Sequence, residues 1–202
     1  MRAVVYSETG PSSVLRLVQR PEPIPGPGEV AVRVMRAGVN PTDWKFRAGL
    51  ANIVGEVPPG QDGAGVVQAV GAGVERFAVG DRVWLLLAQH GRAYGTATEV
   101  TVQPVNHVAP LPEGASFDLG ASLGTPFVTA HRVLTSGVVS RLAPGSLAGQ
   151  AVHDITAALA DNALHVGEHA GLPLHHYDLP RTAAAHDAVE DGAIGKVLLD
   201  LD

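Results

Sequence analysis

Short stretches of alternating apolar and polar residues, separated by glycine and proline turns, occupy the first 115 residues and limit the possible folds more than any other feature. Val30, Val32 and Val34 share one face of an extended chain, which is typical of a half-buried strand. Short strands at intervals of about 8–12 residues favour a β-barrel or a sandwich. We therefore expect strands over residues 2–6, 14–18, 29–36, 65–70, 81–87 and 96–102.

The pattern changes in the second half, where the spacing of apolar residues becomes compatible with helices. Ser116 suits a helix N-cap, and Val152, Ile155 and Leu159 recur at the spacing of one helix face. We expect helices over residues 116–123, 129–134, 151–164 and 180–190, a weakly patterned connector over 137–150, and a closing strand over 196–201.

The composition excludes several classes of function. The chain has no cysteine, which rules out disulfides, thiolate metal sites and a cysteine nucleophile. Its formal charge is −6 and its 14 Lys and Arg residues are spread singly, whereas nucleic-acid binding needs a clustered basic patch. No stretch approaches the ~18 uninterrupted apolar residues of a membrane span, and the first six residues lack the apolar core of a signal peptide. We therefore expect a cytoplasmic protein without nucleic-acid or membrane partners.

Three groups of motifs carry a family resemblance. They are AGVNPTD at residues 37–43; PGQDGAGVV at 59–67 with VG at 70–71 and VGDRV at 79–83; and PLH at 173–175 with AAAHDAVE at 183–190 and GKVLLD at 195–200. In order and spacing they resemble the medium-chain dehydrogenase/reductase superfamily, specifically its zinc-independent NADPH:quinone oxidoreductase (zeta-crystallin-like) branch. The resemblance covers residues 1–135 and 165–202.

The resemblance implies a mainly β fold with flanking helices (α+β). Its centre is a GroES-like, partly open β-barrel that carries the substrate cleft and is closed by a C-terminal helix and strand. Residues 1–136 would form the first segment of this catalytic domain, and residues 165–202 would complete it. Residues 137–164 would form a connector and a helix between the two.

Family members carry a Rossmann domain between those two segments. Such a domain needs well over about 100 residues, because it contains two βαβαβ halves. Fewer than forty residues separate Leu134 from Leu172, and they contain no glycine fingerprint. We infer that the nucleotide-binding domain is missing, with a junction near Gln150 and Ala151. The sequence leaves open whether the deletion is natural or engineered.

Two local patterns resemble binding motifs without their context. Gly63-Ala64-Gly65 begins a near match to a dinucleotide fingerprint, but it precedes a β-branched run and opens no helix, so we interpret it as a barrel turn. His165 and His169 have the spacing of paired metal ligands, but Gly167 weakens that helix and no third ligand is evident. We expect both histidines to be surface residues.

The resemblance also identifies candidate catalytic residues. Zinc-dependent members of the superfamily place metal ligands at the positions of Asn40, Gln61 and, approximately, Thr125. Amides and hydroxyls are poor zinc ligands, so we expect no catalytic metal. The Asn40 amide would lie near the nicotinamide and the substrate carbonyl, where it can donate to a developing oxyanion. The alternative is that Asn40 only favours the turn before Pro41.

The other candidates have both a functional and a structural interpretation. Asp43 is a catalytic candidate that either orients its neighbours or caps a short helix over residues 44–48. Gln61, also a catalytic candidate, and Asp62 would lie at the cleft floor, in contact with substrate or in local hydrogen bonds. Lys45 and Thr125 complete the expected cleft. Lys45 stands where some quinone reductases have a tyrosine, which leaves the substrate class open. Thr129 would contact the nicotinamide if the nucleotide-binding domain were present, and otherwise would cap a helix.

The resemblance implies NADPH as the cofactor of the lineage and a quinone or enone as its substrate. We expect this chain alone to lack hydride transfer, because the helix N-terminus that holds the pyrophosphate is missing. Two alternatives stay open: a cofactor-free small-molecule-binding protein, lyase or isomerase that reuses the cleft, and an inactive engineered module. The face left by the missing domain would be apolar, so we expect either homo-oligomers through it or a connector helix that covers it.

Overall fold

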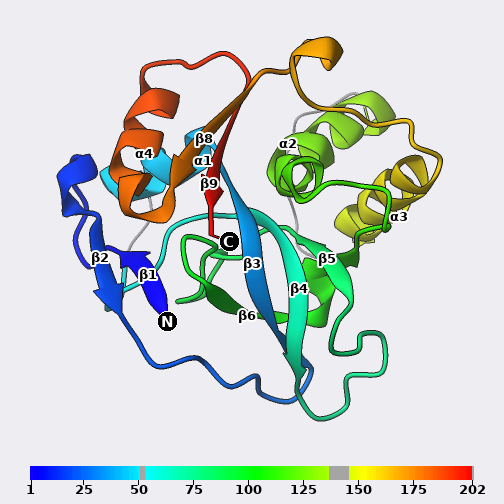
Figure 1. Ribbon diagram of the computed structural model, residues 1–202, viewed down its shortest axis with the longest axis horizontal. Coiled ribbons are helices and arrows are strands. Elements are labelled where there is room, and N and C mark those ends of the chain that lie inside the picture. The colour runs from blue at the N-terminus through cyan, green and yellow to red at the C-terminus, as the bar shows by residue number, and fades with distance from the viewer. Residues whose placement is uncertain (51–52, 137–145, 202) are drawn as a thin grey trace.

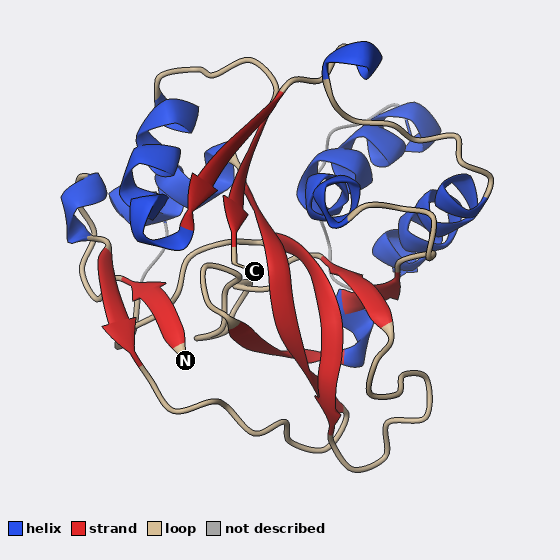
Figure 2. Cartoon of the chain, viewed as in Figure 1, coloured by secondary structure: helices blue, strands red, loops and turns tan. Residues whose placement is uncertain are grey.

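The computed structural model describes residues 1–50, 53–136 and 146–201. A strongly twisted sheet occupies the centre, with α1 and α4 grouped on one side and α2 and α3 on the other (Figures 1 and 2). The strands are β1 (Arg2–Val5), β2 (Arg16–Gln19), β3 (Glu29–Val39), β4 (Asp62–Val70), β5 (Arg82–Leu85), β6 (Val100–Pro104), β7 (Val108–Pro110), β8 (Leu174–Asp178) and β9 (Lys196–Asp200). The α-helices are α1 (Pro41–Lys45), α2 (Phe117–Ser136), α3 (Ser146–Ala160) and α4 (Thr182–Glu190).

The long strand β3 organises the larger sheet, whose order is β7-β5-β4-β3-β9-β8 with β6 also paired to β3. The first half of β3 pairs with β6 and the second half with β9, while β4 runs along most of its other edge. Sharing β3 between successive partners bends the sheet, as in a partly open barrel. No pairing among the described strands joins β7 to β8, so the sheet does not close.

The expected α+β architecture agrees with this arrangement. Val30, Val32 and Val34 are fully buried on the inner face of β3, as their alternation predicts. The C-terminal strand β9 returns to pair with β3, and α4 precedes it. In the described part of the chain the only parallel pair is β8 with β9, and there is no Rossmann sheet. None of the described helices has the length and apolar character needed to cross a membrane.

Several predicted boundaries are wrong. The strand expected over residues 96–102 begins only at Val100, because Thr98 makes an isolated bridge to Ala3 instead. The two helices expected over 116–123 and 129–134 form the single helix α2, kinked at Gly124.

The connector contains more helix than its sequence pattern predicts. Residues 137–145 lie outside the described part, but α3 already begins at Ser146, so the inferred junction at residues 150–151 falls inside a helix. Leu147, Ala148 and Gln150 are good helix formers, and with them the helix begins five residues before Ala151. Ala151, Ile155 and Leu159 are buried in the cluster that includes Leu123 and Val128 of α2. The connector helix therefore packs against α2, while its coverage of the expected apolar face and homo-oligomers through that face both stay predictions.

Candidate functional site

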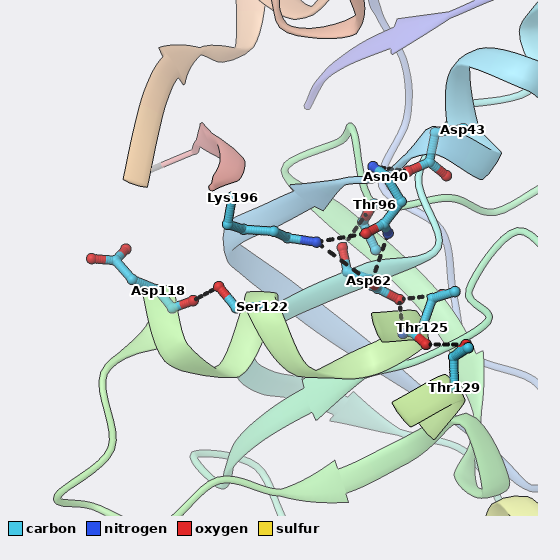
Figure 3. Close-up of polar contacts among 9 residues, drawn as sticks. All are labelled: Asn40, Asp43, Asp62, Thr96, Asp118, Ser122, Thr125, Thr129 and Lys196. Carbon is cyan, nitrogen blue, oxygen red and sulfur yellow. Dashed lines mark hydrogen bonds and ion pairs between the residues drawn. The ribbon is translucent and has the colours of Figure 1, made fainter. Parts of the chain in front are cut away.

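Four segments that are far apart in the sequence bring polar side chains together inside the molecule (Figure 3). Asn40 follows β3, Asp62 begins β4, Thr125 lies just after the kink in α2, and Lys196 begins β9. Asn40 and Asp62 are almost completely buried, and the Lys196 side chain is only 7% exposed. The sheet register places these residues side by side, because Asp62 pairs with Gly38 and Val197 pairs with Val39.

Hydrogen bonds fix these side chains in one arrangement. Lys196 Nζ donates to Asn40 Oδ1 over 2.7 Å, and Asn40 Nδ2 donates to Asp62 Oδ2 over 2.7 Å. Lys196 Nζ also lies 3.7 Å from Asp62 Oδ2. The second oxygen of Asp62 accepts hydrogen bonds from the Thr125 backbone N–H and hydroxyl, each over 2.8 Å. We refer to Asn40, Asp62, Thr125 and Lys196 as the polar cluster.

Two glycines make this close approach possible. The Gly124 backbone leaves helical geometry at φ −13° and ψ −110°, which frees the Thr125 N–H to bond to Asp62. A Cβ atom at Gly124 would lie 2.1 Å from Asp62 Oδ1. At Gly38, a Cβ atom would lie 2.2 Å from the Ala121 carbonyl oxygen and 2.9 Å from Lys196 Nζ. Only glycine at these positions lets α2 and Lys196 approach β3 and β4 so closely.

A third ionisable group, Asp43, lies beside the polar cluster. Its Oδ2 accepts a hydrogen bond from the Asn40 backbone N–H over 2.7 Å, which caps α1. Burial raises the pKa of Asp43 to about 7, and the charge of Asp62 adds to the rise, while the Asn40 N–H and Lys196 oppose it. Burial lowers the pKa of Lys196, and the two carboxylates oppose that change. The charge on Asp43 therefore changes near neutral pH.

A cavity of about 180 Å³ adjoins the polar cluster at Thr125. Gln61 lines it with both amide atoms buried, and neither has a hydrogen-bond partner among the described residues. The Thr42 hydroxyl and His107 Nδ1 are also buried without a partner there. Buried polar groups are almost always paired, so this concentration of unpaired ones points to a ligand. The cavity is lined by Thr42, Phe46, Gln61, Leu87, His90, His107 and Thr125.

The structure separates the predicted site residues into two groups. Gln61 and Thr125 line the cavity, whereas the side chains of Asn40, Asp43 and Asp62 are buried behind it in hydrogen bonds. For Asp43 this is the capping role weighed as the alternative to catalysis. Both polar atoms of the Asn40 side chain are engaged by Lys196 and Asp62.

The remaining two predicted residues lie outside the cavity. Lys45 is exposed, with Nζ 5.6 Å from the centroid of the Trp44 ring, and it does not line the cavity. Thr129 is exposed, and its hydroxyl donates to the Thr125 carbonyl one helical turn earlier rather than capping a helix N-terminus.

Besides the apolar wall residues Phe46 and Leu87, sequence reasoning missed four polar residues of the site. Lys196 had one available signal, a lysine at the start of an otherwise apolar closing strand. Thr42 comes from α1, His90 from a loop and His107 from a short 3-10 helix, and no spacing in the sequence connects them with Gln61.

The barrel turn expected at residues 63–65 is wrong, because Gly63 and Gly65 lie inside β4 and serve strand packing. A Cβ atom at Gly65 would lie 2.0 Å from the Arg33 carbonyl oxygen on β3, so the close approach is to a strand and not to a phosphate. In the described part of the chain, no three His, Asp or Glu side chains gather as a metal site.

Comparisons with known proteins agree with the fold and the motifs. Residues 26–113 match the family model described as the alcohol dehydrogenase GroES-like domain. Over 138 residues, 66% of this chain, the sequence is 37% identical to the quinone oxidoreductase of Rattus norvegicus. The chain belongs to the medium-chain dehydrogenase/reductase superfamily. Another relative in this superfamily, the Rattus norvegicus synaptic vesicle membrane protein VAT-1 homolog, is 38% identical over 138 residues. The matched region spans only 40% and 33% of these two curated relatives.

Solved structures of the superfamily share the fold. The Escherichia coli quinone oxidoreductase complexed with NADPH aligns with a TM-score of 0.80 at 16% identity, covering 99% of this chain and 100% of that one. The human synaptic vesicle membrane protein VAT-1 homolog-like protein aligns with a TM-score of 0.81 at 19% identity, covering 100% of this chain and 98% of that one. At these identities the likeness is one of fold.

Proposed function

We propose that this chain is the substrate-binding domain of a zinc-independent quinone or enone reductase, and that it binds a small carbonyl compound without transferring hydride by itself. The observation that carries the proposal is the buried Gln61 amide, which faces the cavity with no partner in the described structure. Membership of the superfamily and the similarity to quinone oxidoreductases give the substrate class.

The cavity has the chemistry to hold a carbonyl oxygen. The Gln61 amide and the Thr42 hydroxyl each offer a donor, and Phe46 and Leu87 supply apolar walls for a ring or an alkene. Neither Asp43 nor Lys196 lines the cavity, so the buried ionisable groups are not in direct contact with a ligand there. Lys196 and Asn40 hold Asp62, and Asp62 in turn fixes the position of Thr125 on the cavity wall, while Asp43 caps α1.

The residues present do not fit NADPH. The pyrophosphate of a dinucleotide is held at a helix N-terminus that follows a parallel strand through a glycine-rich turn. Among the described residues only β8 and α4 have this arrangement, and the segment between them, Leu179–Arg181, contains no glycine. Of the two residues expected beside the nicotinamide, Thr129 has its hydroxyl engaged within α2, and Asn40 has its amide engaged by Lys196 and Asp62. NADPH supplies the hydride in the lineage, so reduction would require a nucleotide-binding domain that these 202 residues do not provide.

Titration calorimetry with 1,4-naphthoquinone tests the proposal. The wild-type chain should show saturable binding, and Gln61→Leu should weaken it about tenfold, because a hydrogen bond to the carbonyl is lost in a buried site. Gln19→Leu, at an exposed glutamine of β2, is the matched control and should leave binding unchanged. Equal binding by all three proteins, or no binding by the wild type, would refute the proposal.

A further inference from the structure

A second, larger cavity of about 520 Å³ lies between α3 and the sheet corner where β5 and β7 meet. Leu86, Val108 and Pro110 form its floor, and Val152, Ala157 and Ala160 of α3 form its roof. Its volume lies within the ~300–1,000 Å³ range of small-molecule sites. It adjoins the smaller cavity, because Leu87 and His107 line both.

Cationic and basic side chains surround the apolar walls. Arg76 lines the cavity, is exposed, and has its guanidinium 5.2 Å from the centroid of the Phe77 ring, with no ion pair among the described residues. His107 and His153 also line the cavity, and none of its described lining residues is Asp or Glu. His153 Nδ1 lies 3.2 Å from Oδ1 of Asp154, whose carboxylate also bonds to His131 and Gln150, so Arg76 is the cation at the rim that has no ion pair among the described residues.

Basic side chains also surround His107. Burial lowers the pKa of His107, and the neighbouring Arg92 and His90 lower it further, while Arg92 is itself paired with Glu29.

Two further observations indicate a ligand. His107 Nδ1 and the Thr156 hydroxyl are both buried without a hydrogen-bond partner in the described structure, one on each side of the cavity. Leu87, where the two cavities meet, has φ +53°, a left-handed conformation that is unfavourable for a bulky residue and that clusters at ligand sites.

From these observations we propose that the cavity under α3 binds an amphipathic anion, a carboxylate on an apolar body. The body packs between Leu86 and Val108 on one side and α3 on the other. The carboxylate lies toward Arg76 and His153 at the rim. This site shares Leu87 and His107 with the quinone cavity, but its other lining residues differ and its test uses no quinone, so its failure is distinguishable from a failure of the function proposed above.

Titration calorimetry with decanoate, 1-decanol and decyltrimethylammonium on the full chain tests the site, because the three probes share an alkyl chain and differ in charge. Decanoate should bind tightest and the cation weakest. Arg76→Gln should weaken decanoate binding about fivefold and leave 1-decanol unchanged, because a surface cation contributes modestly to binding an anion. Arg33→Gln, at an exposed arginine of β3, removes the same charge away from the cavity and should change nothing.

A space-filling variant checks the location. Ala157 is exposed on α3 and lines the cavity, so Ala157→Phe should keep the fold and weaken all three probes. The site is refuted if decanoate binds no tighter than decyltrimethylammonium, if Arg76→Gln equals Arg33→Gln, or if Ala157→Phe, folded by circular dichroism, binds decanoate like the wild type.

Discussion

Replacing Asp43 by Asn should change the pH dependence of stability in a defined direction. The folded carboxyl has a pKa of about 7 against an ordinary value of 3.8, so the folded state binds more protons than the unfolded state between these values. The cost of burying the charge is fully present above pH 7 and is relieved as the pH falls toward 4. The Asp43→Asn variant would keep a side-chain oxygen to accept from the Asn40 N–H, and it would remove the titration.

The size of the effect follows from linkage. Between pH 8 and pH 5, protonation of Asp43 should stabilise the folded wild type by about 2–3 kcal/mol, and Asp43→Asn does not gain this stability. Constant costs of the substitution, such as an unpaired amide N–H, cancel because the same variant is compared at two pH values.

The assay is urea unfolding at pH 5 and pH 8, followed by tryptophan fluorescence, since Trp84 is fully buried. Relative to the wild type, Asp43→Asn should be more stable at pH 8 than at pH 5 by roughly this amount. If the wild type and the variant differ equally at both pH values, Asp43 does not titrate as its burial implies and the electrostatic description of the polar cluster is wrong.

Three further substitutions test other parts of the structure. Burial and the charge of Arg47 lower the pKa of His186 to about 3, so the folded state resists protonation; this contribution opposes that of Asp43, and between pH 7 and pH 5 the stability of His186→Leu relative to the wild type should rise by about 2 kcal/mol in urea unfolding. Lys196→Met leaves Asp62 without its buried cation and should lower the free energy of unfolding by about 3–5 kcal/mol, whereas Lys45→Met, at an exposed lysine, should change it little; equal effects would contradict the buried pair. Gly38→Ala would place a Cβ atom 2.2 Å from the Ala121 carbonyl oxygen and should prevent folding, while Gly114→Ala, which has open space around it, should fold normally by circular dichroism.

The sequence predicted the structure best where the pattern of apolar residues depends on the burial of a single element. The alternation of Val30, Val32 and Val34 depends only on one face of β3 being buried, so it predicted the strand correctly. The motif order likewise predicted the return of the C-terminal segment to the first, seen in the pairing of β9 with β3. The sequence alone could not predict that Gly124 and Pro126 kink one helix and do not separate two. The helix continues because Asp62, far away in the sequence, accepts a hydrogen bond from the Thr125 N–H that the kink frees.

The site was harder to predict than the fold for the same reason. Gln61 and Thr125 could be identified from the motifs, and both line the cavity. Lys196 and His107 belong to the site only because β9 and the loop before β7 are carried to it by tertiary pairing. The start of α3 was missed because Gly149 was interpreted as part of a connector, although Leu147 continues the four-residue spacing of Ala151 and Ile155.

We propose that the chain binds a carbonyl compound in its cavity but does not bind NADPH. The most direct test titrates NADPH into the 202-residue chain, with and without 1,4-naphthoquinone, and follows nicotinamide fluorescence and NADPH consumption. We expect no saturable change in fluorescence and no NADPH consumption in a sample that binds the quinone by calorimetry. Saturable NADPH binding accompanied by quinone-dependent oxidation of NADPH would contradict it.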